Sequence, residues 1–519
     1  MAGVVTMPEK TLKKLNSYIK PQWKICFFAA ILVGVLAHIY KITNWLPNWD
    51  SLVFRYDAQN MLGLGRWFLP VVTAFSSFYD LPFLNGIIAI IFHALSAVVI
   101  CRIFGVEKKI TAFLIGGVVV AFPTVTSVMM YNYVADGYSI AFFLSSLAAF
   151  FLTKDKPKYI LAVILIALSS GIYQAYLTVT ITIILLKLIN EIIFENCEIK
   201  VILKKTLFIL ISGILGVILY SIILKVLLGV FSIELIDYQG VSSSFSLASL
   251  NLVSSLYLVK ETFIKCFFDF SFGANVYIVL NAVAFLWAIV LYIGYIIKNK
   301  IYKNIGKLIA VGIFAVGLVF GAGALAFINP SIDYHNLMLM GYCIFYIALI
   351  ILYEKGKQEK CEIIKNWAIL LIAIGIVFNQ IVIANVSYHK AQMAYEKSFG
   401  VLVRIADRIE EAEGTEDFDK ILVVGSLKDS EDYSVNLTPH ITGITDGYII
   451  RADDETVNQS VLTSALNDYC GKDYDFLSGA EKQKLIETEE IKAMGIWPEK
   501  NSVKTIDDIV IVKLSEGEK

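Results

Sequence analysis

Long apolar runs are the feature that most restricts the fold of this chain. They recur between Lys24 and Val386, and each is long enough to cross a hydrocarbon core of roughly 30 Å as an α-helix. A helix satisfies its own backbone hydrogen bonds, as a chain in lipid must do. The sequence therefore predicts a mainly α, polytopic membrane protein with about eleven spans. The predicted spans are residues 25–42, 83–100, 110–130, 138–153, 159–173, 175–190, 206–229, 276–297, 308–327, 337–353 and 367–386.

Basic residues are unevenly divided among the segments that connect these spans. If the N-terminus lies inside, 23 of the 29 Lys and Arg residues before residue 387 fall in inner segments. Basic segments next to spans favour the cytoplasmic side. The apolar run Ile25–Tyr40 lacks a small-residue cleavage site, so we predict a retained first span instead of a removed signal peptide. We expect a multi-pass protein of the cell membrane, with a cytoplasmic N-terminus and an extracytoplasmic C-terminal domain.

Residues 159–190 decide the orientation of every later span. One kinked helix would send the cluster around Lys204 to the outer side, whereas two short helices that turn near Gly171 keep it inside. The second arrangement preserves the charge bias, but each helix then has only about 15 residues. The turn from Gly171 to Tyr176 is therefore expected at or below the outer lipid surface. Non-helical backbone persists at that depth only where protein buries it or where it lines a cavity.

The chain changes character after Val386. Residues 387–519 carry 15 Lys and Arg against 27 Asp and Glu, whereas residues 1–386 carry 29 against 18. The tail opens with a pattern over 390–412 that predicts an amphipathic helix, and apolar runs at Ile421–Gly425 and Ile509–Val512 predict strands. We predict a transmembrane domain over 1–386 and a small α/β domain over 387–519. The acidity of the tail argues against direct binding of nucleic acid.

The first outer loop holds the densest group of polar and aromatic residues in the membrane part. Asp50, Arg55, Asp57 and Arg66 stand there beside several Trp and Tyr residues. One interpretation is an interfacial helix with an aromatic belt. The other is a site where a carboxylate and a guanidinium meet an amphiphilic substrate at the membrane surface.

Three further groups of candidate residues fall on the same expected side. Asp136 follows Tyr131 and Asn132 at the lip of a short span, where it could face a cavity or cap the helix. Tyr173 and Gln174 occupy the turn described above, and His335 lies in a short outer loop, where it is either functional or a plain loop histidine. Aromatic and amide side chains suit sugars, arginine suits phosphate, and a carboxylate can act as a general base.

Three motifs in order resemble a known family. They are Asp50 with Gly65-Arg66-Trp67, then Ala135-Asp136-Gly137-Tyr138-Ser139, then Ser170-Gly171-Ile172-Tyr173-Gln174-Ala175. With the order of hydrophobic segments over residues 1–386, they resemble the bacterial serotype-converting glucosyltransferases. These are the type II phage-type O-antigen enzymes of the GT-C superfamily of membrane glycosyltransferases.

The resemblance implies a lipid-linked donor and an inverting displacement. A single sugar, expected to be glucose, would pass from polyprenyl phosphate to a cell-surface glycan on the outer face, with Asp50 as general base. As a hypothesis, Arg55 or Arg66 stabilises the departing phosphate. The remaining candidates would bind substrate: Asp57, whose role is open, and Tyr131, Asn132, Asp136, Tyr173, Gln174 and His335. The expected partners are the donor, the acceptor glycan and membrane lipids. No cofactor is predicted, although a divalent metal is left open.

Rival functions also fit a polytopic chain with interfacial aromatics. A transporter or flippase of lipid-linked sugars would be expected to place ionisable or helix-breaking residues near mid-membrane, often in paired halves, and this chain places them at the outer edge. A polysaccharide polymerase or ligase would take an oligosaccharide from a pyrophosphate carrier. A surface scaffold would need no intact first loop.

Overall fold

The computed structural model forms two compact units. It describes residues 8–47, 51, 59–236, 251–268, 276–329, 332, 334–356, 360–413, 418–427, 455–477 and 479–516. The first unit comprises Met1–Ile42, Asp57–Met129 and Val134–Ala384. The second comprises Thr43–Tyr56, Met130–Tyr133 and Asn385–Lys519. The second unit thus contains part of the first outer loop in addition to the tail.

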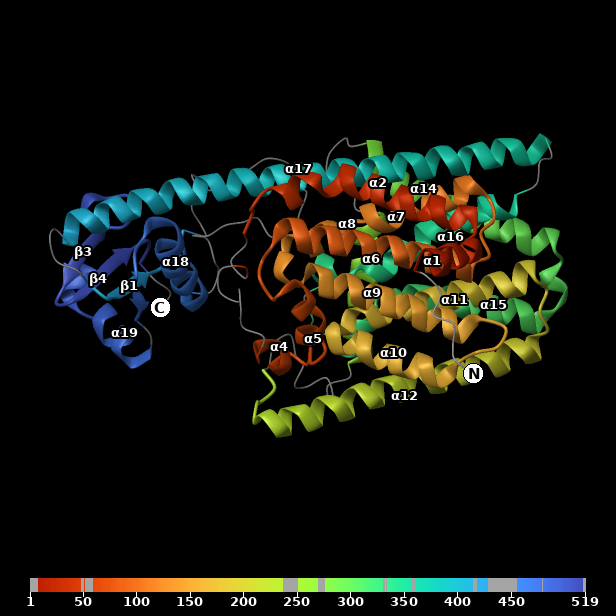
Figure 1. Ribbon diagram of the computed structural model, residues 1–519, viewed down its shortest axis with the longest axis horizontal. Coiled ribbons are helices and arrows are strands. Elements are labelled where there is room, and N and C mark those ends of the chain that lie inside the picture. The colour runs from red at the N-terminus through yellow and green to blue at the C-terminus, as the bar shows by residue number, and fades with distance from the viewer. Residues whose placement is uncertain are drawn as a thin grey trace. The chain divides into compact units, whose positions relative to one another are not determined.

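Eight helices in the described residues are long and apolar enough to cross a membrane (Figure 1). They are α2 (Pro21–Thr43), α6 (Pro82–Ile103), α9 (Asn132–Thr153), α11 (Leu177–Phe194) with the 3-10 turn η2 (Gln174–Tyr176) before it, α12 (Ile199–Phe231), α14 (Val276–Lys298), α15 (Ile305–Ala322) and α17 (Lys360–Glu413). A ninth candidate is the pair α7 (Lys109–Ala121) and α8 (Pro123–Met130), which is bent by 40°. The bend falls at Pro123, whose ring removes a backbone donor and clashes with the preceding turn.

The remaining two predicted spans are also helical but shorter. They are α10 (Tyr159–Ile172), with 14 residues, and α16 (Cys343–Lys355), with 13 residues. The break between α10 and η2 falls at Tyr173, where the sequence predicted a turn. The predicted polytopic helical architecture is therefore confirmed.

Two details differ from the sequence-based expectation. α9 begins at Asn132, six residues before the predicted span, so Asp136 lies inside the helix and is not its N-cap. α17 runs for 54 residues without interruption, whereas the sequence pattern predicted a span over 367–386 and a separate amphipathic helix over 390–412. No proline or glycine pair interrupts that segment, so nothing in its sequence forces a break.

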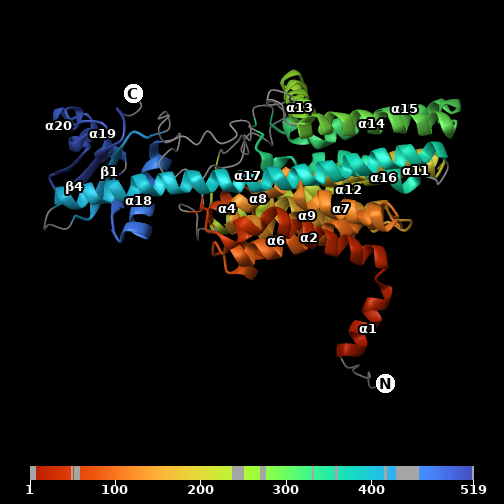
Figure 2. The ribbon, with the colours of Figure 1, turned by 90° about the horizontal axis from the view of Figure 1, so that it is seen from above.

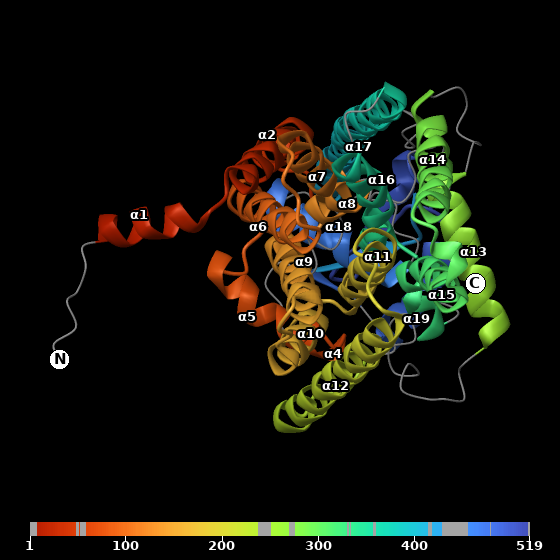
Figure 3. The same cartoon turned by 90° about the vertical axis from the view of Figure 1, so that its right-hand side faces the viewer.

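Helices of the first unit pack in pairs (Figure 3). α10 lies along α12, α11 along α15, and α6 along α7. Glycines allow close approach: an added Cβ at Gly216 would meet Ile166, 2.6 Å away. A short helix, α13 (Leu252–Phe267), packs beside α14 and α15 (Figure 2).

A short helix, α1 (Pro8–Tyr18), precedes α2. Between α2 and α6 lie α4 (Gln59–Gly63), α5 (Leu69–Thr73) and the 3-10 turn η1 (Ala74–Ser76). Further 3-10 turns are η5 (Ile301–Lys303), η6 (Ala324–Phe327), η7 (Asn336–Met338) and η8 (Met340–Tyr342).

The tail of the second unit is an α/β fold around a four-stranded sheet. The strands are β1 (Lys420–Val424), β2 (Asp475–Phe476), β3 (Val503–Ile506) and β4 (Ile509–Lys513), in the order β2-β1-β4-β3. β1 pairs in parallel with β2 and β4, and β3 is antiparallel to β4. The helices are the C-terminal part of α17 with α18 (Glu455–Cys470), α19 (Gly479–Ile486) and α20 (Glu489–Lys492), and η10 (Lys500–Ser502) precedes β3.

Alternating residues of β1 face two cores. Ile421 and Val423 pack in one cluster with residues of α17 and α18, whereas Leu422 and Val424 pack in another with residues near α20. A strand that is apolar on both faces is typical of a parallel sheet covered on both sides.

Candidate functional site

A loop between α4 and α5 is docked onto the turn that follows α10. The backbone N–H of Phe68 donates to the carbonyl of Gly171 over 2.7 Å. The side-chain amide of Gln174 donates to the carbonyl of Leu64 over 3.3 Å. Two of the three sequence motifs, Gly65-Arg66-Trp67 and Ser170–Ala175, are therefore in direct contact, although about 100 residues separate them along the chain.

Gly65 adopts a left-handed backbone that brings this loop close to α12. Its φ is 76°, and an added Cβ would lie 2.7 Å from the Tyr220 hydroxyl and 2.8 Å from the Gln174 amide nitrogen. Tyr220 donates to the Gly65 carbonyl over 3.0 Å, and Gln174 donates to the Tyr220 hydroxyl over 2.9 Å. Tyr220 and Gln174 thus tie the loop, the turn and α12 together through hydrogen bonds to the Gly65 and Leu64 carbonyls and to each other.

Gly171 provides the second close approach. The indole of Trp67 covers it so closely that an added Cβ would lie 2.5 Å from the ring. The small size of Gly65 thus leaves room for Gln174 of the other motif, and the small size of Gly171 leaves room for Trp67.

The third motif joins through stacked tyrosines. Tyr138 of α9 and Tyr173 are parallel within 9°, with ring centroids 4.6 Å apart. The Arg66 guanidinium lies 4.9 Å from the Tyr173 ring centre and 6.0 Å from that of Tyr138. A planar cation over an aromatic face is held in orientation, and its hydrogen-bond donors remain directed to its edge. The arrangement orients a guanidinium, which suits bidentate contact with a phosphate.

Asp136 lies two residues before Tyr138 in α9 and is 1% exposed. Its carboxylate accepts hydrogen bonds from the N–H of Gly137, over 2.8 Å, and from the hydroxyl of Ser76. These contacts join α9 to η1. Its partners in the described residues therefore give it a structural surrounding rather than a place on a cavity wall.

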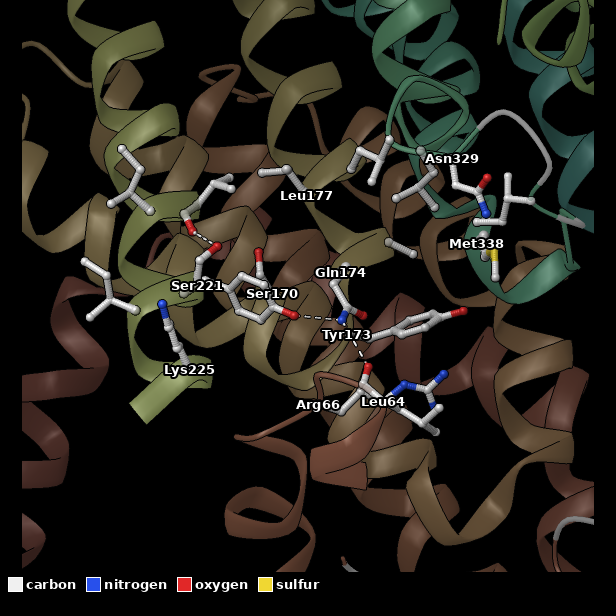
Figure 4. A pocket seen from close by; sticks show the side chains of 18 residues that line it. Leu64, Arg66, Ser170, Tyr173, Gln174, Leu177, Ser221, Lys225, Asn329 and Met338 are labelled. Carbon is white, nitrogen blue, oxygen red and sulfur yellow. Dashed lines mark hydrogen bonds between the residues drawn. The ribbon is translucent and has the colours of Figure 1, made fainter. Parts of the chain in front are cut away.

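A cavity of about 470 Å³ lies beside Arg66 (Figure 4). Most of its wall is apolar, and its polar groups come from Arg66, Ser170, Tyr173, Gln174, Tyr220, Ser221, Lys225 and Asn329. Figure 4 shows Arg66 next to Tyr173, with Ser221 and Lys225 of α12 on one side of the cavity and Asn329 and Met338 on the other. An apolar volume with a few polar groups and two cations is suited to an amphiphile that carries an anionic head.

The predicted site residues have different positions in the structure. Arg66, Tyr173 and Gln174 line the cavity, whereas the buried Asp136 is not among its lining residues. Tyr131 and Asn132 belong to the second unit. Asp50, Arg55 and Asp57 lie outside the described residues.

His335 does not line this cavity. It is half-buried just before η7, and its carbonyl accepts from the N–H of Met338 over 2.9 Å. The neighbouring Tyr334 donates to the Gly323 carbonyl over 2.8 Å, and burial raises the pKa of its hydroxyl. These bonds fix the loop that brings Asn329 and Met338 to the cavity wall.

Sequence analysis missed the contribution of α12. Tyr220 and Lys225 line the cavity but fall inside a predicted span, whereas the predicted site residues came from loops, turns and the ends of spans. A lysine within an apolar span was the available signal, because ionisable groups at such positions commonly face a cavity or a partner.

No group of three His, Cys, Asp or Glu side chains with metal-binding geometry occurs among the residues that the structure covers.

Comparison with known protein families identifies the family of this chain. The model of the family described as Glucosyl transferase GtrII matches residues 39–328, which is more than half of the 519 residues and includes all three motifs. The chain matches no curated protein and no solved structure.

Proposed function

Because this chain belongs to the GtrII glucosyl transferase family, we propose that it moves a single glucose from polyprenyl phosphate to a cell-surface glycan. The family makes it a glycosyltransferase, and its apolar helices make it a multi-pass membrane protein. The donor, the inverting course and the outer-face location belong to the proposal.

One observation supports this donor above the others. Arg66 is held on the faces of Tyr173 and Tyr138 at the wall of a mainly apolar cavity. A lipid phosphate needs a cation for its head and an apolar surface for its chain, and both occur here. A water-soluble nucleotide sugar would use neither the apolar wall nor a position among spans.

The proposed reaction is a direct displacement. The oxygen of an acceptor hydroxyl attacks the anomeric carbon while the bond from that carbon to the phosphate oxygen breaks, which inverts the configuration. Asp50 takes the hydroxyl proton, and polyprenyl phosphate leaves as an anion. Arg66, with Arg55 as an alternative, stabilises the charge that develops on the leaving phosphate. The role of Asp50 follows from the family resemblance.

Tyr173 and Gln174 are proposed to contact the sugar or its phosphate, because they share the cavity wall with Arg66. Asp136 is proposed to act indirectly, by holding α9 and η1 where Tyr138 can stack on Tyr173. Tyr131, Asn132, Asp57 and His335 remain candidates for the acceptor side. Polyprenyl phosphate is a good leaving group, so the proposal includes no metal.

The deciding experiment uses the purified full-length protein in lipid nanodiscs. Synthetic polyprenyl phosphate glucose and an isolated surface glycan are supplied without any gradient, and the product is measured by mass spectrometry. A gain of one hexose is expected, and Asp50→Asn should abolish it while the protein still folds. Glu261→Gln, at an exposed carboxylate of α13 outside the proposed site, is the control for loss of a carboxylate.

The same assay separates the rival functions. A flippase would give no product in nanodiscs, where there are no compartments to connect. A polymerase or ligase would transfer an oligosaccharide from a pyrophosphate carrier and ignore the monophosphate donor. Near wild-type transfer by Asp50→Asn would remove Asp50 from the role of base.

A further inference from the structure

The helix that precedes the first span, α1, is amphipathic. Lys10, Lys13 and Lys14 are spaced three and four residues from Lys10, which places them on one face of the helix. Leu12 lies on roughly the opposite side from Lys10 and Lys14, at about 100° per residue. The one acidic residue of α1 is Glu9. A polar helix with a basic face and an apolar face is typical of the boundary between lipid and water.

The apolar residues of α1 are not covered by the described part of the chain. Wherever the burial of an α1 side chain is described, that side chain is exposed. Leu12 and Tyr18 are 62% and 68% exposed, and Ile19, directly after the helix, is 44% exposed. A free helix of 11 residues is also barely stable in water. The helix therefore needs a surface that covers its apolar face.

The junction between α1 and α2 lies at the level where a membrane interface is expected. Only Ile19 and Lys20 separate the two helices, and Pro21 disfavours helical backbone at the residue before it. The ring centre of Trp23 lies 5.9 Å from the Lys20 ammonium and 5.4 Å from the Arg102 guanidinium. Tryptophan and basic residues at the end of a span mark the headgroup layer. Figures 2 and 3 show that α1 leaves the bundle there and runs across the direction of the spans.

The end of the first unit that carries α1 is rich in lysine. The spans alternate in direction, so the turns that follow α9 and α14 lie at the end where α2 begins. Lys156 and Lys158 are exposed in the first of these turns, and Lys300 and Lys303 are exposed in the second. Asp155 is the one acidic residue in the two turns. This excess of positive charge is complementary to an anionic bilayer surface.

We propose that α1 lies in the headgroup layer of the bilayer and binds anionic phospholipid. Lys10, Lys13 and Lys14 contact the lipid phosphates, while Leu12 and Tyr18 insert among the first segments of the acyl chains. The helix then fixes the level at which α2 enters the bilayer. This inference does not depend on the proposed function, because it concerns the surrounding membrane and not the sugar donor.

The test compares the full-length protein in nanodiscs of two compositions. One contains phosphatidylcholine alone, and in the other about one third of the lipid is phosphatidylglycerol. Mass spectrometry follows hydrogen exchange of the α1 amides at low salt. Each lysine near an anionic surface contributes about fivefold to binding, so exchange should be about 10–100-fold slower with phosphatidylglycerol. High salt should reduce the difference, because it screens exposed charges.

The decisive variant neutralises the basic face of α1 through Lys10→Gln, Lys13→Gln and Lys14→Gln together. It should remove the difference in exchange rate between the two compositions. The matched control removes the same number of charges from exposed lysines of the tail, through Lys484→Gln, Lys492→Gln and Lys500→Gln. The control should leave the exchange of α1 as in wild type.

A second variant tests the apolar face. Leu12→Ser should speed exchange of α1 in both compositions, because it removes an inserted side chain. Equal exchange of wild-type α1 in the two compositions would overturn the role of anionic lipid. Fast exchange in both would overturn the position in the headgroup layer and indicate a site for another protein. Slow exchange that requires two copies of the protein in one disc would overturn the lipid assignment in favour of a contact between copies.

Discussion

The contacts inside the first unit differ in kind from the contacts inside the second unit. In the tail of the second unit, apolar residues from both sides of the sheet form clusters from which water is excluded. In the first unit many large apolar side chains are exposed, among them Leu215 of α12 at 48%, so helix packing depends on small residues and on a few hydrogen bonds. In the tail of the second unit, apolar side chains therefore form a core from which water is excluded. On the outer faces of the first unit's helices, apolar side chains instead suit contact with lipid.

The largest expected effect concerns arginines that lie on aromatic rings in each unit. Arg66 lies over Tyr173 in the first unit, and Arg404 lies 5.1 Å from the ring centre of Trp497 in the second. Arg66→Ala should lower kcat/KM for glucose transfer by about 10²–10³-fold, the usual loss when a preorganised charge donor is removed. Arg404→Ala should leave transfer near wild type. Both variants are measured in the same nanodisc assay. Comparable losses of kcat/KM would show that any loss of an arginine–ring contact impairs the protein, and would contradict a specific role of Arg66 in the site.

The next prediction contrasts buried and lipid-facing leucines. Leu462 of α18 is fully buried against β1, and Leu462→Ala should lower the free energy of unfolding by about 2–5 kcal/mol through the cavity that it leaves. Leu215→Ala, on the exposed face of α12, should change stability by less than about 0.5 kcal/mol. Thermal unfolding of the full chain in detergent measures both. Equal losses would contradict the distinction between the two units.

A third prediction concerns glycine in the first unit. Gly171→Ala forces a methyl group against Trp67 and should destabilise the protein by about 1–3 kcal/mol, with a loss of transfer because the Arg66 loop shifts. Gly213 of α12 has open space where a Cβ would stand, so Gly213→Ala should be neutral or slightly stabilising. The two melting temperatures should therefore move in different directions. A Gly171→Ala variant as stable and active as wild type would mean that the two motifs need no close contact.

The smallest expected effect joins the first outer loop to the tail within the second unit. The indole N–H of Trp45 donates to the hydroxyl of Tyr469 over 2.7 Å. A double-mutant cycle with Trp45→Phe and Tyr469→Phe should give a coupling energy of about 0.5–1.5 kcal/mol in unfolding experiments. Because Tyr469 also contacts Tyr395, only the coupling term reports this bond. A coupling energy of zero would show that this hydrogen bond does not stabilise the contact between the loop and the tail.

The sequence allowed the spans to be predicted because lipid imposes a length and a composition on them. The turn at Tyr173 followed from the short halves of residues 159–190. The contact of the Gly65-Arg66-Trp67 segment and of Tyr138 with the Ser170–Ala175 segment is seen only in the structure. The position of Lys225 on the cavity wall could not be predicted from the sequence. The same apolar residue types occur on a helix face that contacts lipid and on one that lines a cavity. The continuity of α17 was missed because its change from apolar to amphipathic resembles the end of a helix. For Asp136 the sequence allowed either a helix cap or a position facing a cavity, and the start of α9 at Asn132 excludes the cap.

The cavity is open to lipid along Val217, Ile218 and Ile222 of α12, which are 37%, 47% and 56% exposed, and this has a kinetic consequence. A ligand that enters from the bilayer reaches the cavity by lateral diffusion. Its binding rate therefore depends on its mole fraction in the bilayer and not on its concentration in the whole suspension. Diluting the donor with inert phospholipid should then slow the enzyme, whereas adding buffer should not.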